Sequence, residues 1–233
     1  MNKISLIVMI KGEVKTGKSH LAMTAPDSIM VDLTHDSNAK AAAFNVYGEE
    51  FEERYYKVDD YVELEKIVEE TEAKSVCIDE SKNLRDIYAK KFLVENKKKK
   101  VFPISEWGGI YEDIQERLFR KYDGKKNFMI TGGVKDRRVF DKDSKTEVVT
   151  GQRVADGLNI LPTVADVILH VEVNESKKGS PPKMTRSRNI IVIRNRFLDI
   201  ANEEVWVEHV SSIEELIEKI CENSKFEKEM FVI

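Results

Sequence analysis

The sequence predicts an α/β fold in which helices flank a central, mostly parallel β-sheet. Short apolar runs alternate along the chain with stretches whose apolar residues recur every three to four positions. The short runs are typical of buried strands and the periodic stretches of amphipathic helices. A glycine-containing segment also follows the first apolar run and precedes a helical pattern, which is the order strand, loop, helix.

Six apolar runs are expected to form the strands of the sheet. They are residues 4–10, 28–31, 75–78, 128–131, 167–173 and 190–193. Apolar residues at helical spacing predict helices over residues 61–68, 84–95, 110–118 and 213–220. Ser212 and Glu215 form a capping box that marks the start of the last helix.

Two segments are expected to decorate this core. In residues 137–150, two stretches with strand character flank the polar sequence DKDSK, which predicts a β-hairpin that projects after the fourth parallel strand. Residues 174–188 contain one glycine and two prolines, which break regular structure, and are expected to be a loop between two strands.

The composition limits the possible functions. Of the 233 residues, 41% are hydrophobic, and no run of about 18 apolar residues occurs that could cross a membrane. The two cysteines have no metal-ligand spacing. We therefore expect a cytoplasmic protein with no membrane contact. The net charge of −4 argues against a uniformly basic surface, so any contact with DNA must be local.

Residues 12–19, GEVKTGKS, match the phosphate-binding pattern GxxxxGK[ST]. Backbone N–H groups of such a loop cradle phosphates, its lysine reaches the β and γ phosphates, and its serine hydroxyl binds Mg²⁺. We expect ATP rather than GTP, because no NKxD tetrapeptide is present. The residues assigned to the nucleotide are Gly12, Glu13, Val14, Lys15, Thr16, Gly17, Lys18, Ser19 and His20, with Ser19 also a metal ligand.

A phosphate-binding loop needs a second acid, which usually ends a neighbouring buried strand. In SVCIDE, Asp79 is expected to hold Mg²⁺ through water and Glu80 to polarise the attacking water. Asp32 and Asp36, after the second strand, are alternatives for this second role. Thr131 ends another strand, where its hydroxyl either senses the γ phosphate or bonds to backbone.

The order of these motifs resembles the RecA-superfamily ATPases of phages, archaeal viruses and plasmids, a group that includes single-strand-annealing recombinases. The resemblance rests on GEVKTGKS, MVDLTHD, VCIDE, EWGGIYEDI, FMITGGVKDRRVF, TGQ, LPTVADVILHVEV and IRNRF. It implies a RecA-like P-loop domain over residues 1–200. Residues 201–233, which lie beyond the resemblance, are expected to extend the same domain by a strand and a helix. It also implies an ATPase that binds Mg²⁺, assembles on single-stranded DNA and promotes annealing or recombination.

The resemblance further implies roles for basic residues. Arg194 and Arg196 would reach the nucleotide of the neighbouring subunit in a ring or filament, with an ion pair inside the chain as the alternative. The loops after the fourth and fifth core strands would bind DNA. Their candidate residues are Arg137, Arg138, Lys177, Lys178, Lys183, Arg186 and Arg188.

Other interpretations stay open. Related proteins often carry a glutamate after the second strand, and its absence here leaves room for slow hydrolysis or for a non-catalytic ATP switch that scaffolds other proteins. A helicase or genome-packaging motor would share the same phosphate-binding loop. The apolar residues 231–233 are a candidate docking peptide for a neighbouring subunit.

Overall fold

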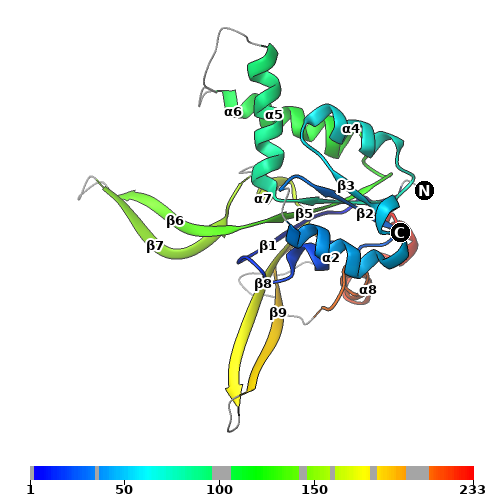
Figure 1. Cartoon of the computed structure of the whole chain (residues 1–233). Helices are drawn as coiled ribbons and strands as arrows, with labels where there is room; N and C mark the ends of the chain where they lie inside the picture. The colour runs from blue at the N-terminus through cyan, green and yellow to red at the C-terminus, as the bar shows by residue number, and fades with distance from the viewer. Residues whose placement is uncertain are drawn as a thin grey trace.

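The computed structural model describes residues 3–34, 37–95, 106–141, 146–157, 161–178, 183–197 and 210–233. Within them, a seven-stranded sheet lies between two layers of helices, and two long β-ribbons project away from this body (Figure 1). The prediction of an α/β fold with a mostly parallel sheet is confirmed. Among these residues, no helix is long and apolar enough to span a membrane.

The sheet has the strand order β3-β2-β4-β5-β1-β8-β9. Its strands are β1 (Ile7–Gly12), β2 (Ser28–Asp32), β3 (Tyr55–Lys57), β4 (Ser75–Asp79), β5 (Asn127–Gly132), β8 (Val167–Lys178) and β9 (Lys183–Asn195). All neighbours are parallel except β8 and β9. The six predicted strands are present. The edge strand β3 was not predicted, because its three residues are too few to make an apolar run.

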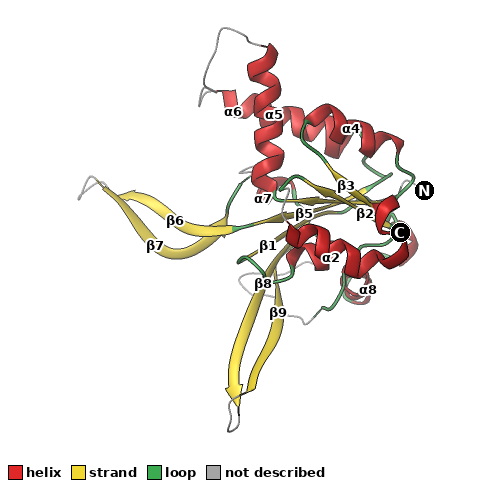
Figure 2. Ribbon diagram, viewed as in Figure 1, coloured by secondary structure: helices red, strands yellow, loops and turns green. Residues whose placement is uncertain are grey.

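Helices cover both faces of the sheet (Figure 2). One face carries α1 (Lys18–Ala22), α2 (Ser37–Tyr47), α3 (Phe51–Arg54) and α8 (Ile213–Glu222). The other carries α4 (Tyr61–Glu70), α5 (Ser81–Glu95), α6 (Trp107–Ile114), the π-helix η3 (Gln115–Arg120) and α7 (Leu161–Val164). The short helices η1 (Gly48–Glu50) and η4 (Lys228–Met230) also belong to the described residues.

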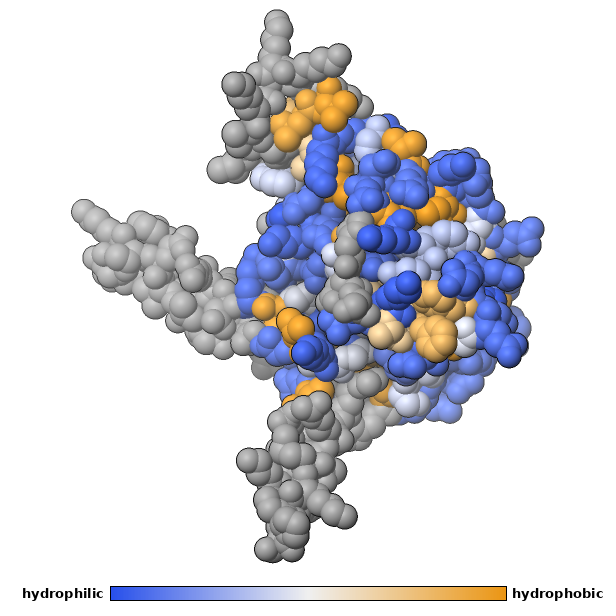
Figure 3. Space-filling model, viewed as in Figure 1, coloured by the Kyte–Doolittle hydropathy of each residue, from blue (hydrophilic) through white to orange (hydrophobic). Residues whose placement is uncertain are grey.

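Two apolar cores result, one on each face of the sheet. Neighbouring residues of β1 alternate between them, with Val8 and Ile10 in the core under α1 and α8 and Met9 in the core under α4 and α5. This alternation is the side-chain period of a strand, so one buried strand serves both layers. The outer face of the body seen in Figure 3 is mainly hydrophilic, with scattered apolar patches.

Helix ends follow the capping signals. The side chain of Asp60 accepts hydrogen bonds from the backbone N–H groups of Val62 and Glu63 and so caps α4. Ser212 accepts from the N–H of Glu215 at 3.1 Å, as the predicted capping box requires. The Glu215 carboxylate accepts a hydrogen bond from the N–H of Ser211. In a capping box this donor would be the N–H of Ser212, one residue later.

Both ribbons leave the sheet at the end where its parallel strands have their carboxyl termini. The first consists of β6 (Val134–Asp141) and β7 (Thr146–Ala155) and forms a separate antiparallel sheet, which confirms the predicted hairpin. Because β3 precedes it, this hairpin follows the fifth strand of the chain and not the fourth. The second ribbon is the outer part of β8 with β9.

The prediction of a loop over residues 174–188 is wrong. Strands β8 and β9 remain paired up to Lys178 and Lys183, so that only residues 179–182, outside the described residues, separate them. A two-stranded ribbon that projects from the sheet has little core to cover, so polar residues can form it without an apolar run. The glycine and both prolines fall on residues 179–182, outside the described part.

The prediction of a docking peptide at residues 231–233 is also wrong. Phe231 is fully buried and forms a bridge with Ile4, next to β1. The side-chain amide of Asn127 donates to the carbonyl oxygen of Val232 at 2.6 Å. The C-terminal residues therefore complete the core of their own chain, and helix α8 is present as predicted. The strand expected before it falls on residues 201–209, outside the described part.

Candidate functional site

The carboxyl ends of the parallel strands bring the predicted site residues together. Gly12 ends β1, Asp32 ends β2 and Asp79 ends β4. Asp32 and Asp79 are register partners, and Thr131 lies near the end of β5. Ligands of open α/β sheets bind beyond this edge of the sheet. Both ribbons leave from the same edge (Figure 1).

Residues 13–17, here called the glycine loop, connect β1 to α1. Gly17 has a φ of 89°, in the left-handed region that glycine adopts without steric cost. Lys15 also has a positive φ, 64°, which costs a residue with a side chain about 1 kcal/mol. The hydroxyl of Thr16 donates to the carbonyl oxygen of Glu13 at 2.9 Å and holds the turn. The helix that follows, α1, is short and ends at Ala22.

The side chain of Lys18 folds back over the glycine loop. Its Nζ donates to the carbonyl oxygens of Gly12, at 3.0 Å, and of Glu13, at 2.7 Å. Burial lowers the pKa of Lys18, and nearby carboxylates, with Glu80 the strongest, oppose the shift. The ammonium group is thus held over the loop by two neutral oxygens, which phosphate oxygens of a ligand can replace.

Asp79 accepts two hydroxyl groups on one carboxylate oxygen. Ser19 Oγ donates to Asp79 Oδ1 at 2.8 Å, and Thr131 Oγ1 donates to the same atom at 2.6 Å. Burial raises the pKa of Asp79, and the hydrogen bonds from Thr131 and Ser19 oppose this shift. A serine hydroxyl beside a carboxylate is a set of hard oxygen ligands, the kind that Mg²⁺ prefers.

No group of three or more metal-ligating His, Cys, Asp or Glu residues occurs among the residues that the structure describes. A magnesium ion held at Ser19 and Asp79 would take most of its ligands from a bound phosphate and from water. This is the usual arrangement for Mg²⁺ in phosphate sites, where the protein supplies only one or two ligands.

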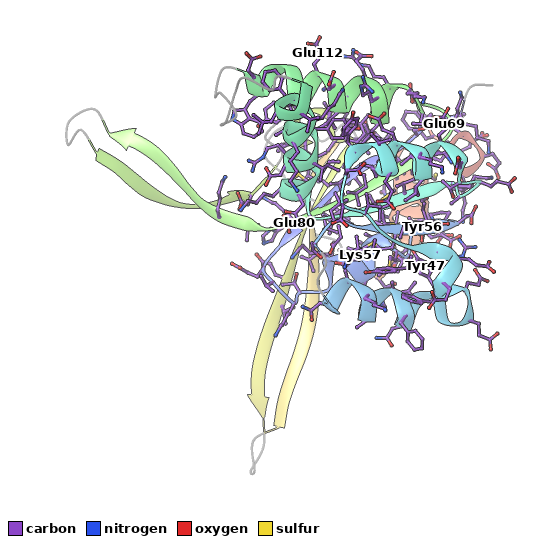
Figure 4. All side chains as sticks on the ribbon, turned by 45° about the horizontal axis from the view of Figure 1, so that its top comes forward. Tyr47, Tyr56, Lys57, Glu69, Glu80 and Glu112 are labelled. Atoms are coloured by element: carbon purple, nitrogen blue, oxygen red, sulfur yellow. The ribbon has the colours of Figure 1, made fainter. Side chains whose placement is uncertain are left out.

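Glu80 has an unusual backbone conformation. Its φ of 74° lies in the left-handed region, although it is not glycine. Its N–H donates to Thr131 Oγ1 at 2.9 Å, and its carbonyl oxygen accepts from the N–H of Leu84 at the start of α5. Figure 4 shows Glu80 where α5 and the ribbons meet the sheet.

The charge state of Glu80 depends on this setting. Burial raises the pKa of the Glu80 carboxyl group, and the neighbouring charge of Asp79 raises it further. The backbone groups of Gly133 and Lys82 oppose this shift of the pKa because they favour the charged carboxylate. A carboxyl group with a raised pKa at the wall of a cavity has the character of a general base.

Asp32 differs from Glu80, although sequence left both as candidates for the same role. Asp32 is fully buried, and its Oδ1 accepts from the N–H and the hydroxyl of Thr34, at 2.8 and 2.6 Å. Its Oδ2 accepts from the hydroxyl of Tyr55 at 2.6 Å. Three donors therefore engage this carboxylate. Asp36, the other alternative, lies outside the described residues.

A cavity of about 350 Å³ joins these groups. Its lining residues are Val14, Lys15, Gly17, Lys18, Ser19, His20, Thr34, Asn38, Ala39, Ala42, Asp79, Glu80 and Thr131. Six of the nine residues predicted to bind nucleotide line it, as do Asp79 and Glu80, whereas Asp32 does not. The wall from α2 was missed, because small residues such as Ala39 and Ala42 carry no signal of their own in the sequence.

Arg196 lies away from this cavity. Because β9 is antiparallel to β8, its end lies at the opposite edge of the sheet, beside the start of β8. There the Arg196 guanidinium pairs with Asp166 at 3.3 Å and donates to the carbonyl oxygen of Thr163. The ion pair inside the chain, the alternative interpretation, is therefore present. The side chain of Arg194 lies outside the described part.

The residues predicted to bind DNA lie along the two ribbons. Arg137 and Arg138 belong to β6, and Lys177 and Lys178 end β8. The others, Lys183, Arg186 and Arg188, belong to β9. The backbone register places Lys178 opposite Lys183 and Glu175 opposite Arg186, so these charges gather on the outer part of the second ribbon. Their side chains lie outside the described part.

Comparison with known proteins assigns neither a family nor a function to this chain. No protein-family model matches the chain, and no curated protein matches it. The functional interpretation therefore depends on the geometry of the cavity and on the sequence motifs.

Proposed function

We propose that this protein is a RecA-like P-loop ATPase that binds ATP and Mg²⁺ in the cavity beside the glycine loop and acts on single-stranded DNA in annealing or recombination. One observation carries the proposal. The hydroxyl of Ser19 lies 2.8 Å from a carboxylate oxygen of Asp79, although the two residues are 60 positions apart. A phosphate-binding loop and a strand-end acid need this proximity to share a magnesium ion.

Each residue then has a defined task. Lys18 exchanges its two loop carbonyl oxygens for phosphate oxygens, and the N–H groups of the glycine loop bind the phosphates. Ser19 and, through water, Asp79 hold Mg²⁺, which neutralises charge on the phosphate oxygens when bound. Glu80 lies on the cavity wall, where it can orient and polarise the attacking water.

The proposed DNA contact is supported by the position and charge of the ribbons. Both leave the edge of the sheet that carries the cavity. Residues 174–188 contain five Lys or Arg residues and one acid in a chain whose net charge is −4. A local concentration of positive charge is what a phosphate backbone requires, and it makes binding sensitive to salt.

Assembly of several copies is part of the proposal. Among the described residues that line the cavity there is no arginine. Phosphate transfer is commonly assisted by an arginine that a second protein or subunit supplies. A ring or filament with nucleotide between subunits would supply such a residue from the neighbouring copy.

A nucleotide-dependent switch with slow turnover is the second candidate. The observation that favours it is Asp32, the acid that ends the second strand, whose buried carboxylate is engaged by Thr34 and Tyr55 and lies outside the cavity lining. Such a protein would bind ATP and assemble in the same way, yet hydrolyse the nucleotide slowly.

Calorimetric titration of the full chain with Mg–ATP and Mg–GTP tests the site, with Lys18→Ala as the disabled variant. Anisotropy of a labelled single-stranded oligonucleotide, with and without Mg–ATP, tests the DNA contact. We expect ATP-dependent, salt-sensitive binding that is lost when Lys177, Lys178 and Lys183 are all changed to Ala. A wild type that binds neither Mg–ATP nor the oligonucleotide would refute the proposal. Phosphate release measured on the same samples separates the ATPase from the switch.

A further inference from the structure

A second cavity, of about 290 Å³, lies at the opposite end of the parallel strands from the glycine loop. Ile7, the first residue of β1, and Phe128, near the start of β5, belong to its wall. Phe119 and Val164 complete the apolar part of this wall, and the rings of Phe119 and Phe128 pack edge-to-face with their centroids 5.4 Å apart. A cavity of about 150 Å³ already holds a benzene ring. This cavity, here called the aromatic pocket, therefore has room for an aromatic side chain.

The π-helix η3 forms one side of the aromatic pocket. Its wide turn is seen in the hydrogen bond from the N–H of Lys121 to the carbonyl oxygen of Glu116, five residues earlier, at 3.2 Å. Such a turn brings residues four and five positions apart to one side of the helix. Gln115, Phe119 and Arg120 accordingly all line the pocket. Helices of this kind are rare and are frequently found at functional sites.

The charges at the mouth of the aromatic pocket are unevenly compensated. Arg196 pairs with Asp166 at 3.3 Å, and Arg120 pairs with Glu116. Asp123 also lines the pocket, is exposed, and has no ion pair with any residue that the structure describes. The pocket thus combines an apolar interior with a free negative charge at its mouth. These properties fit an aromatic ring that carries a positive charge beside it.

Helix α2 presents such a ring on the other face of the sheet. The side chain of Phe44 is 61% exposed, and no other aromatic residue is exposed in the described part of the chain. Its ring packs edge-to-face on Phe51, with the centroids 5.8 Å apart, which limits its movement. Lys40 lies one helical turn earlier on the same side of α2, and its Nζ lies 5.9 Å from the centre of the Phe51 ring. Lys40 forms no ion pair with a described residue.

We propose that Phe44 of one copy of this protein inserts into the aromatic pocket of a second copy, where Lys40 faces Asp123 of that copy. An aromatic anchor that fills a pocket is the type of contact that carries most of the energy of an interface. The inference rests on the proposed function, whose assembly step it assigns to two surfaces of the chain.

The two surfaces lie on different sides of the molecule. Helix α2 covers one face of the sheet, whereas η3 and α7 cover the other (Figure 1). Each copy therefore has a free ring on one side and a free pocket on the other. Contacts between unlike surfaces repeat from head to tail, and they produce a ring or an open filament.

Sedimentation velocity of the full chain with Mg–ATP, over a range of protein concentrations, tests this contact. Wild type should form assemblies larger than a dimer. Phe44→Ala should weaken association about 30-fold or more, as loss of an aromatic anchor does. Val62→Ala, the control, truncates a side chain on α4 that is 57% exposed, and it should associate like wild type. A wild type that stays monomeric, or a Phe44→Ala variant that assembles fully, would overturn the inference.

Mixing two variants distinguishes a head-to-tail contact from a symmetric one. Gln115→Trp fills the aromatic pocket and keeps Phe44, whereas Phe44→Ala keeps the pocket. Each variant alone should be monomeric, because every contact between its copies lacks one side. An equal mixture should form a dimer and nothing larger, since one intact ring then meets one intact pocket. A mixture without this dimer would contradict the inference.

Charge reversal tests the contact without a change inside the pocket. Lys40 and Asp123 are both exposed, so substitutions there should preserve the fold. Lys40→Glu and Asp123→Lys should each weaken association several-fold, because each places like charges together. A chain with both substitutions should recover wild-type association, because the pair is restored with reversed signs. Losses that simply add in this chain would also overturn the inference.

Calorimetric titration with Mg–ATP on the same samples separates this inference from the proposed function. A wild type that binds Mg–ATP yet stays monomeric refutes the inference and leaves the nucleotide site. A wild type that assembles with the expected pattern in the mixture, yet binds no Mg–ATP, refutes the proposed ATPase and supports the contact.

Discussion

Asp32 and Asp79 are register partners on adjacent strands, yet only Asp79 faces the cavity. The Asp79 carboxylate accepts from Ser19 and Thr131, which line the cavity with it. The Asp32 carboxylate accepts from Thr34 and from Tyr55, which belongs to the edge strand β3. The two neighbouring acids thus have different roles. Asp79 is available to a ligand in the cavity, whereas Asp32 holds β2 to the edge strand β3.

This difference predicts opposite effects of two substitutions. Asp32→Asn should reduce the free energy of unfolding by about 1–3 kcal/mol, because one set of donors would then face an amide NH₂ group. Its nucleotide affinity and kcat should be close to wild type. Glu80→Gln should keep the stability and lower kcat about 100-fold. Urea unfolding and steady-state ATP hydrolysis measure the two effects, and a large loss of kcat in Asp32→Asn would reverse the assignment.

Lys18→Ala should weaken binding of Mg–ATP about 10- to 100-fold, since it removes a charged donor to phosphate oxygens. The fold should be unaffected, because Lys18 bonds only to loop carbonyl oxygens at the rim of the cavity. Calorimetric titration gives the affinity. Lys228→Ala, which removes exposed ion pairs to Glu214 and Glu218, is the matched control and should bind like wild type.

Asp79→Asn should stabilise the protein at neutral pH in the absence of metal, by about 1–2 kcal/mol. Burial raises the pKa of Asp79 above its ordinary value of 3.8, so the folded state holds this proton more tightly than the unfolded state does. Stability therefore falls as the pH rises from 3.8 through the raised pKa. The asparagine should be neutral at every pH and still accept both hydroxyl groups.

The advantage of Asp79→Asn should accordingly be largest above the raised pKa and shrink toward acid pH. Urea unfolding of both proteins across this range measures it. Addition of Mg–ATP should invert the order, because the ligand stabilises only the protein that binds it. An advantage that does not vary with pH would contradict the linkage.

Phe231→Ala should reduce the free energy of unfolding by about 3–5 kcal/mol, as expected for loss of a fully buried aromatic side chain. Phe231 packs edge-to-face against Phe197, with ring centroids 5.5 Å apart. Because it lies inside its own chain, the variant should keep the oligomeric state of wild type. Thermal unfolding and sedimentation velocity report the two quantities, and a variant of full stability but smaller oligomer size would restore the docking interpretation.

The features that were predicted correctly are those that a local pattern of residues in the sequence determines. The glycine loop has a fixed spacing, and buried strands need apolar runs, so the sequence predicts β1, β4 and β5 and the acids at the end of β4. The predicted hairpin of residues 137–150 likewise has a polar sequence between two stretches with strand character.

The remaining features depend on tertiary context. Strand β3 is short, and it gains its place by pairing with β2 and by the Tyr55 hydroxyl bonded to Asp32. The direction of β9 follows from its tight connection to β8, and this direction places Arg196 at the far edge, beside Asp166. No pattern of apolar residues reports the direction of a strand. The hydrogen bond from Ser81 to the carbonyl oxygen of Asp156 likewise joins segments that only the folded sheet brings together.

The bridge between Ile4 and Phe231 has a practical consequence. It holds the two ends of the chain together on the side of the body opposite the ribbons (Figure 1). An affinity tag, a fluorophore or a surface anchor attached at either end would therefore leave the cavity and both ribbons accessible. Single-molecule experiments on immobilised protein can be designed on this basis.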